Sequence, residues 1–311
     1  MIYVITLPSI ETRYTGQWYK WMWSYVDSTK RQDIRVMGDN LAIKIPPTEF
    51  LDFRQYYFKV YPFLMATIKV IKSGDTVFFM DGETAGVEAF EYIRKMENIK
   101  VDIRTFWHSG TYDKYDLTAI RGVHGENFER GWFDITDKIY VSSDFHKRLL
   151  VESRGVEKEK IIVTGNPLDL NLFSDGTKTI KTNNVMYAGR LVPEKGYDIV
   201  KELRKKRIDI TVSLENKWDK KRFYEELAAS KVLFSPSKQD MFATACMEAF
   251  GSNVPVLVPD IENYKEIIPE RYRYKKLEDI DWNNLEKLST GNERKLVEKF
   301  QYEKVMEEWF K

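Results

Sequence analysis

Short, continuously apolar runs alternate with longer amphipathic stretches through most of this chain of 311 residues. Several of the apolar runs are rich in β-branched residues, which is typical of parallel strands covered on both faces. Strands that alternate with helices predict βαβ units and therefore α/β sheets. The predicted strands are residues 2–7, 76–80, 101–106, 138–141, 161–164, 185–188, 208–212, 232–235 and 254–258, and the predicted helices are residues 84–96, 144–154, 196–206, 220–229 and 242–250.

Nine strands are more than a typical single sheet holds, so two sheets in two domains are expected. Chain length agrees, since a domain usually has about 150 residues. Gly, Pro, Asn and Ser concentrate in residues 165–177, and a new strand–helix series begins at Val185. We therefore predict an N-terminal domain of residues 1–173 and a C-terminal domain of residues 174–311. Residues 292–311 are predicted to form a charged amphipathic terminal helix.

The charge balance and the scarce metal ligands exclude several classes of function. Lys and Arg number 49 against 48 Asp and Glu, a net charge of +1, so the chain has no general electrostatic footprint for nucleic acid. Cys246 is the single cysteine, which excludes an internal disulfide framework and a cysteine-cluster metal site. The three histidines, His108, His124 and His146, are too few and too scattered for a typical zinc site, so no metal is expected.

The N-terminal residues 1–8 lack a basic region and a cleavage site, so they are interpreted as a buried strand rather than a signal peptide. No run approaches about 18 apolar residues, so a cytoplasmic protein without a membrane span is expected. Trp18, Trp21, Met22 and Tyr25 recur at helical spacing. Such a stripe favours a core or a partner domain, while peripheral contact with a membrane surface stays open.

The first chemically informative segment is residues 185–196, VMYAGRLVPEKG. A buried strand ends at Gly189, and Arg190 and Lys195 follow on the loop that leads into the next helix. Ligands of open α/β sheets bind at the carboxyl ends of strands. Arg and Lys there suit a diphosphate, since one offers a fork of donors and the other a point charge. The alternative is a loop with two solvated cations.

The second segment is residues 234–256, which contain a strand end, a loop and a helix beginning near Phe242. Asp240 lies on the loop, and the first free amides of the helix, around Ala243 and Thr244, make an anion site. Glu248 lies inside this small, apolar helix, where it can accept two hydrogen bonds from the vicinal diol of a ribose. The alternative is a capping Asp240 and an ordinary buried, paired Glu248.

Together the two segments resemble the retaining nucleotide-sugar glycosyltransferases of the GT-B fold, and the similarity is strongest over residues 142–268. The run at 187–196 resembles the strand end and phosphate loop of that family, with Gly189 at the strand end. The resemblance implies that Arg190 and Lys195 hold the donor diphosphate and stabilise its leaving charge.

Residues 235–249 resemble the paired-acid motif of the family, in which seven residues separate two acids. The resemblance implies that Glu248 binds the nucleotide ribose and that Asp240 lies near the donor sugar. It also implies that Phe242, Ala243 and Thr244 belong to the donor site. Two departures stand out: Asp240 is one methylene shorter than the usual Glu, and Ala243 replaces a usual Gly.

The resemblance is weaker in the first half. His108, in the run TFWH, resembles a strand-end histidine that contacts the donor sugar in the family, and a structural, hydrogen-bonded His108 is the alternative. Gly16, in the run YTGQ, resembles the remnant of the first glycine loop of the family.

The resemblance implies two Rossmann-like domains that face each other across a cleft, with the last helix crossing back to the first. It implies metal-independent transfer with retention at the anomeric carbon, and a nucleotide-sugar substrate in place of a cofactor. The alternatives are a non-catalytic nucleotide-sugar-binding protein and an epimerase or phosphorylase of the same fold. The sequence identifies neither the base, the sugar, the acceptor nor the oligomeric state.

Overall fold

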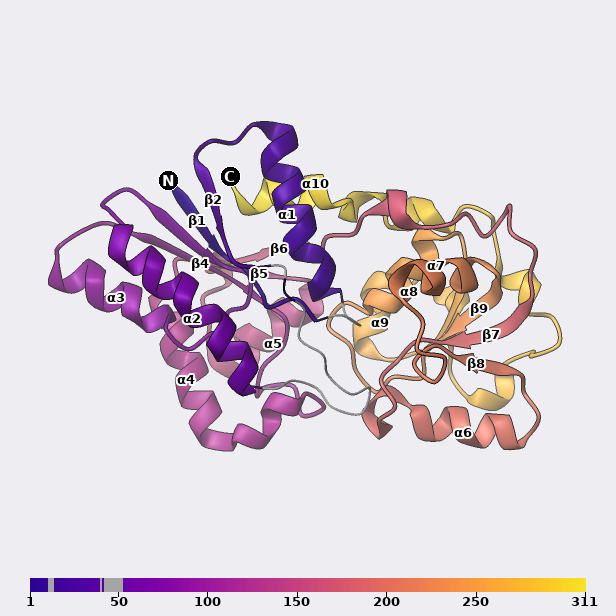
Figure 1. Cartoon of the computed structure of the whole chain (residues 1–311). Helices are drawn as coiled ribbons and strands as arrows, with labels where there is room; N and C mark the ends of the chain where they lie inside the picture. The colour runs from indigo at the N-terminus through magenta and orange to yellow at the C-terminus, as the bar shows by residue number, and fades with distance from the viewer. Residues whose placement is uncertain (11–13, 40, 42–52) are drawn as a thin grey trace. The chain divides into compact units, whose positions relative to one another are not determined.

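The computed structural model describes residues 1–10, 14–39, 41 and 53–311 (Figure 1). Contacts within the chain divide it into two compact units, which we call unit 1 (Met1–Gly165 with Met306–Lys311) and unit 2 (Asn166–Val305). The predicted boundary was 173/174. The division at 165/166 coincides with the start of the Gly- and Pro-containing stretch on which that prediction was based.

Unit 1 is built on a six-stranded parallel sheet in the order β2-β1-β3-β4-β5-β6. The chain moves outward from β1 to β2 and then returns past β1 to β3, so the strand order reverses between β1 and β3. The elements are β1 (Ile2–Ile5), α1 (Thr15–Thr29), β2 (Ile34–Met37), α2 (Phe53–Val70), β3 (Thr76–Phe79), α3 (Val87–Met96), β4 (Asp102–Trp107), α4 (Gly122–Ile135), β5 (Lys138–Val141), α5 (Asp144–Arg154) and β6 (Ile161–Val163).

Helices α2 to α5 cover one face of this sheet and α1 covers the other (Figure 1). On the α1 face, Trp18 packs against Phe106, with ring centroids 5.3 Å apart, and against Trp309 at 5.6 Å. Trp309 also packs against Phe78 at 5.3 Å, and its indole N–H donates to Thr164 Oγ1 at 3.1 Å. The C-terminal residues therefore return to unit 1, as predicted.

The aromatic stripe of α1 belongs to this core, because Trp18, Trp21, Met22 and Tyr25 are all buried. This confirms the preferred interpretation of the stripe as core-facing. Among the helices of the described residues, none combines the length and the apolar character that crossing a membrane requires.

Unit 2 has a five-stranded parallel sheet in the order β11-β10-β9-β7-β8, which reverses between β7 and β9. The elements are β7 (Asn183–Tyr187), α6 (Tyr197–Lys205), β8 (Ile210–Val212), α7 (Lys220–Ala228), β9 (Ser230–Phe234), α8 (Thr244–Gly251), β10 (Val256–Pro259), α9 (Glu262–Ile267) and β11 (Arg273–Tyr274). The last helix, α10 (Tyr302–Trp309), begins in unit 2 and passes into unit 1 at Met306. Two parallel α/β units confirm the predicted fold class.

Two predicted helices show where the sequence prediction agrees best with the structure and where it disagrees most clearly. Helix α5 has the predicted bounds because Ser143 caps it, accepting from the amide of His146, and Gly155 ends it with φ 68°. The single helix predicted for residues 292–311 is wrong. Gln301 forms a parallel bridge with Leu168, so the backbone is extended there, and only short 3₁₀ turns precede α10.

Candidate active site at the strand reversal of unit 2

The loops that follow β7 and β9 lie side by side, because these two strands are neighbours in the sheet. The amide of Lys238 donates to the carbonyl of Glu194 at 3.0 Å, and Lys195 Nζ donates to the carbonyl of Gln239 at 3.3 Å. The two loops thus form one continuous surface at the carboxyl ends of the strands. This is the position where open α/β sheets bind their ligands.

Two glycines of the first loop occupy positions where a side chain would clash, and one of them lies against the second loop. A Cβ on Gly196, which has φ 75°, would lie 2.3 Å from the carbonyl oxygen of Pro236 in the second loop. A Cβ on Gly189 would lie 2.5 Å from the hydroxyl of Tyr187, which itself lies 2.6 Å from the carbonyl oxygen of Arg190. A larger residue at Gly196 would therefore push the two loops apart, and one at Gly189 would displace the Tyr187 ring within the first segment.

The two predicted phosphate-binding cations both lie on this surface. Lys195 Nζ is 3.1 Å from Asp240 Oδ2, and Arg190 Nη2 is 3.5 Å from Glu194 Oε1. The side chains of Arg190 and Lys195 are 21% and 22% exposed, so a ligand can reach both. Each cation is paired with a carboxylate, and a diphosphate can take the place of that carboxylate as the hydrogen-bond acceptor.

Helix α8 starts beside these cations, at the end of the second loop. Its N-cap, Ala243, has φ 53° and ψ 52°, a left-handed conformation that costs a non-glycine residue about 1–2 kcal/mol. Thr244 and Ala245 follow in the first turn, where amides have no intrahelical acceptor and favour an anion. Phe242 is buried and packs edge-on against Phe300, so it anchors the loop to the core.

Glu248 lies one turn into α8, 4% exposed. Its Oε1 accepts from Lys220 Nζ at 2.8 Å and from the hydroxyl of Tyr224 at 2.9 Å. Lys220 and Tyr224 lie four residues apart on one face of α7. Sequence reasoning missed both, and their helical spacing was the only signal that paired them. The structure contains the buried ion pair that the sequence left open as an alternative, and the ribose role stays a prediction.

Asn263, in α9, is a further residue of the site that sequence reasoning missed. Its Nδ2 donates to the backbone carbonyl of Asp240 at 2.9 Å, and the residue is 3% exposed. This bond fixes the loop that carries Asp240 relative to α9. Nothing in the local sequence around Asn263 indicates this long-range contact.

Cys246 is completely buried beneath the same surface, and burial raises the pKa of its thiol. A neutral, inaccessible thiol reacts slowly, since the thiolate is the nucleophile. We expect a bulky thiol reagent to label the native protein at less than about a tenth of its rate on the urea-unfolded chain. Mass spectrometry of labelled samples over time would measure this, and equal rates in both states would contradict the burial.

In unit 1, His108 follows β4 and ties together the loops at the reversal of that sheet. Its Nε2 lies 2.8 Å from the carbonyl oxygen of Met80, and its Nδ1 lies 2.9 Å from the hydroxyl of Tyr14. A carbonyl only accepts, so Nε2 carries the proton and Nδ1 accepts from Tyr14. Burial lowers the pKa of His108, which keeps the ring neutral. Gly16 lies in the first turn of α1, where a Cβ would lie 2.9 Å from the carbonyl oxygen of Ile10.

The acidic turn after β3 is also engaged within unit 1. Asp81 Oδ2 accepts from the hydroxyl of Tyr56 at 2.6 Å, and Oδ1 accepts from the amide of Glu83 at 3.1 Å. Glu83 Oε1 accepts from Arg121 at 2.6 Å. Burial raises the pKa of Glu83 well above its usual range, against the opposing effect of Arg121. These bonds support a structural role for the turn.

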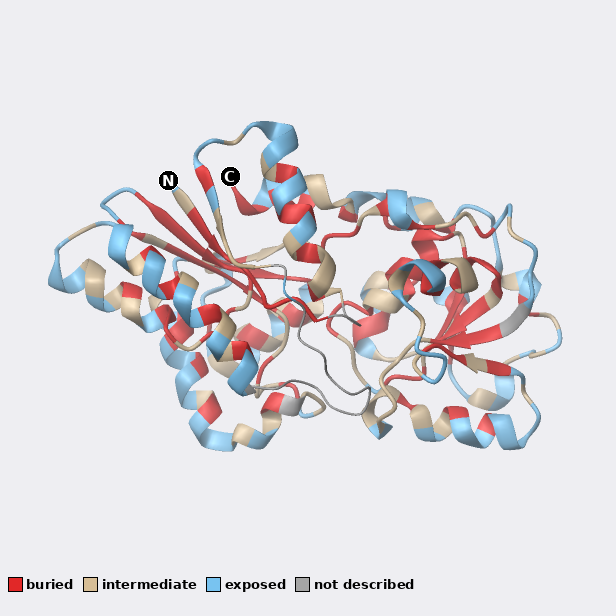
Figure 2. Ribbon diagram, viewed as in Figure 1, coloured by how far each residue is buried: buried red, intermediate tan, exposed pale blue. Residues whose placement is uncertain are grey.

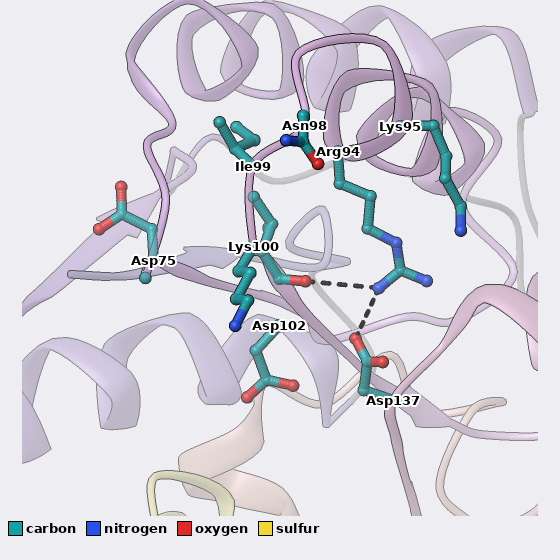
Figure 3. Close-up of a pocket in the computed structure, with 10 residues that line it drawn as sticks. Asp75, Arg94, Lys95, Asn98, Ile99, Lys100, Asp102 and Asp137 are labelled. Atoms are coloured by element: carbon teal, nitrogen blue, oxygen red, sulfur yellow. Dashed lines mark hydrogen bonds and ion pairs between the residues drawn. The ribbon is translucent and has the colours of Figure 1, made fainter.

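A cavity of about 600 Å³ lies at the opposite edge of the unit 1 sheet, near the amino ends of β3, β4 and β5 (Figure 3). Arg94 crosses it and donates to Asp137 at 2.9 Å and to the carbonyl of Ile135 at 2.9 Å. The guanidinium is already bound, and ligands of open α/β sheets bind at the carboxyl ends of the strands rather than at their amino ends. We therefore assign no ligand site to this cavity. Nowhere in the described part of the chain do three or more Cys, His, Asp or Glu gather as metal ligands.

Comparison with known proteins identifies the fold by structural similarity, whereas the sequence matches no known family. No protein-family model and no curated protein matches the sequence. Among solved structures, sucrose-phosphate synthase from Thermosynechococcus elongatus is similar with a TM-score of 0.70 and 13% identity, over 99% of this chain and 98% of that one. Anabaena HepE, solved with UDP and glucose, is similar with a TM-score of 0.66 and 11% identity. The lipopolysaccharide outer core galactosyltransferase WaaB is similar with a TM-score of 0.62 and 14% identity. Each comparison covers 99% of this chain and 98% of the other. The chain therefore has the GT-B fold.

Proposed function

We propose that this chain is a retaining glycosyltransferase that moves a sugar from a nucleoside-diphosphate donor to an acceptor. The observation that carries the proposal is the joined surface at the strand reversal of unit 2. There, Arg190 and Lys195 lie on the loop that is bonded to the segment leading into α8, and Glu248 lies one turn inside that helix. This arrangement suits a diphosphate followed by a ribose. The fold shared with HepE and WaaB supports it.

The proposed reaction breaks the bond between the anomeric carbon and the diphosphate oxygen and forms a bond from the acceptor oxygen to that carbon on the same face. The proton of the acceptor passes to the departing phosphate. Arg190, Lys195 and the first amides of α8 neutralise the charge that develops on the leaving diphosphate. With these groups supplying the charge, the reaction as proposed needs neither a metal nor a carboxylate nucleophile.

We assign Asp240 to the donor sugar and the acceptor to the strand reversal of unit 1. The carboxylate of Asp240 is held beside Lys195, and its backbone is fixed by Asn263. His108 stays a proposed sugar contact, although both ring nitrogens are bonded within unit 1. An unchanged KM and kcat in a His108→Gln variant would leave that residue with a structural role alone.

Glu248→Ala is expected to weaken the binding of the nucleoside diphosphate by about 10- to 100-fold, because two charge-assisted hydrogen bonds to the ribose are lost. Isothermal titration calorimetry with UDP, GDP and ADP measures this. Glu293→Ala is the matched control, since Glu293 is also a buried, bonded glutamate of unit 2. Equal affinities of wild type and Glu248→Ala would exclude the ribose role.

The donor can be identified by a thermal-shift screen of nucleotide sugars, because a ligand that binds only the folded state raises its stability. UDP-sugars are tested first, since HepE was solved with UDP and glucose. The donor that binds is then incubated with candidate acceptors, and the anomeric configuration of the product is determined by NMR. Binding without consumption of the donor, by any acceptor or by water, would favour a non-catalytic nucleotide-sugar-binding protein instead.

A further inference from the structure

The outer face of α2 exposes a stripe of large apolar side chains. Phe58, Tyr61 and Met65 are 81%, 41% and 59% exposed, at spacings of three and four residues along the helix. Figure 2 shows exposed and buried stretches in turn along the ribbon of α2. The inner face of the helix packs on the sheet of unit 1 through Tyr56 and Val60, among other buried residues. Thus α2 is apolar on both faces, and the described residues of unit 1 cover only one of them.

Basic residues border this stripe. Residues 53–72 contain Arg54, Lys59, Lys69 and Lys72 and neither Asp nor Glu. Lys69 and Lys72 are exposed at the C-terminal end of the helix, whereas Lys59 is bonded to Asp39. The segment therefore carries four positive charges in a chain whose net charge is only +1.

We propose that the outer face of α2 docks on an anionic lipid surface. An exposed face that combines aromatic and flexible apolar side chains with flanking cations is typical of interfacial helices. Anionic headgroups complement Lys69 and Lys72, while Phe58 and Met65 enter the boundary between headgroups and acyl chains. This inference rests on unit 1 and stands independently of the proposed transferase activity.

Charge argues against a second copy of the chain as the occupant of this face. In a two-fold symmetric contact, the same patch meets itself. Two copies of α2 would then bring the exposed Lys69 and Lys72 of each copy together, and residues 53–72 offer no carboxylate to pair them. A surface rich in fixed negative charge removes that repulsion.

Pro62 sets how deeply the helix can enter. It lies inside α2 on the exposed face, and without an N–H it leaves the carbonyl of Phe58 without its helical donor. Such a carbonyl needs water, which the hydrocarbon core does not supply. The geometry is therefore that of a helix lying in the hydrated headgroup layer.

The test is co-sedimentation of the full chain with vesicles of phosphatidylcholine, alone or with about one third phosphatidylglycerol. We expect binding to the anionic vesicles, loss of most of it at about 0.5 M salt, and little binding to the neutral ones. Phe58→Ser combined with Met65→Ser should lower the partition coefficient at least about tenfold, and so should Lys69→Glu combined with Lys72→Glu.

The matched control is Leu172→Ser combined with Ile180→Ser, which removes two exposed apolar side chains from unit 2 and should leave binding unchanged. Circular dichroism melts verify that every variant is folded, and the lysine pair tests the proposal if the serine pair unfolds. Absence of binding, or binding that neither α2 pair reduces, overturns the proposal. Light scattering that shows a dimer broken by the α2 variants would instead assign the face to a second copy.

Discussion

Arg190→Ala is expected to lower kcat by about 100- to 1000-fold, the usual effect of removing one donor that stabilises developing charge. Its side chain is 21% exposed, and its Nη2 lies 3.5 Å from Glu194 Oε1. In the proposed reaction it stabilises the leaving diphosphate most when that group carries its full charge. The donor affinity should therefore change much less than kcat.

The measurement is steady-state kinetics with the donor identified by the thermal-shift screen, together with calorimetry of donor binding. Lys238→Ala is the matched control, because Lys238 is an exposed cation on the second loop whose backbone, not its side chain, bonds Glu194. Equal losses of kcat in both variants would show that the general positive charge of the loops matters rather than Arg190. A loss of donor affinity without a loss of kcat would show that Arg190 binds the donor but does not stabilise the transition state.

Trp309→Ala is expected to lower the free energy of unfolding by about 3–5 kcal/mol, the usual cost of truncating a fully buried tryptophan. The side chain has no exposed surface, and its indole contacts Phe78, Phe106 and Trp18. Its N–H also loses the bond to Thr164 Oγ1. Removing the ring therefore opens a cavity where the C-terminal segment meets the sheet of unit 1.

Urea unfolding followed by circular dichroism measures this loss, and Trp23→Ala is the control. Trp23 lies on α1 with 46% of its surface exposed, so its truncation should cost only about 0.5 kcal/mol. A similar small loss in Trp309→Ala would contradict the packing described for the C-terminal segment. The backbone carbonyl of Trp309, which accepts from Arg104 and Tyr140, stays in place in either case.

The sequence predicted the strands that are short apolar runs and missed β2 and β11, which contain Arg35 and Arg273. It also missed helices whose composition conceals them. Helix α2 contains Pro62, and α4 contains Gly122, Gly125 and Gly131, residues that normally interrupt helices. Both helices form because their apolar faces cover the sheet of unit 1, among them Val60 and Trp132. Tertiary packing overrode local preference there, as it did when the bridge at Gln301 ended the predicted terminal helix.

The family resemblance implied that Arg190, Lys195 and Asp240 belong to one donor site, and their positions after parallel strands are consistent with that, because the carboxyl ends of such strands share one edge of the sheet. The contact between Lys195 and Asp240 agrees with that expectation. The pattern of apolar runs predicts where strands occur but not which strands are neighbours in the sheet. The order that places β9 beside β7 decides that these two loops meet.

The sequence by itself determined the apolar strands, the two-sheet organisation and the chemical identity of the cations and acids, because these depend on composition and spacing along the chain. Only the tertiary structure decided that Lys220 and Tyr224 hold Glu248, that Asn263 fixes Asp240, and that the C-terminal segment returns to unit 1. It also decided that the stripe of α1 is buried while that of α2 is exposed. Such contacts join residues far apart in the chain, and helical periodicity marks an apolar face without saying what will cover it.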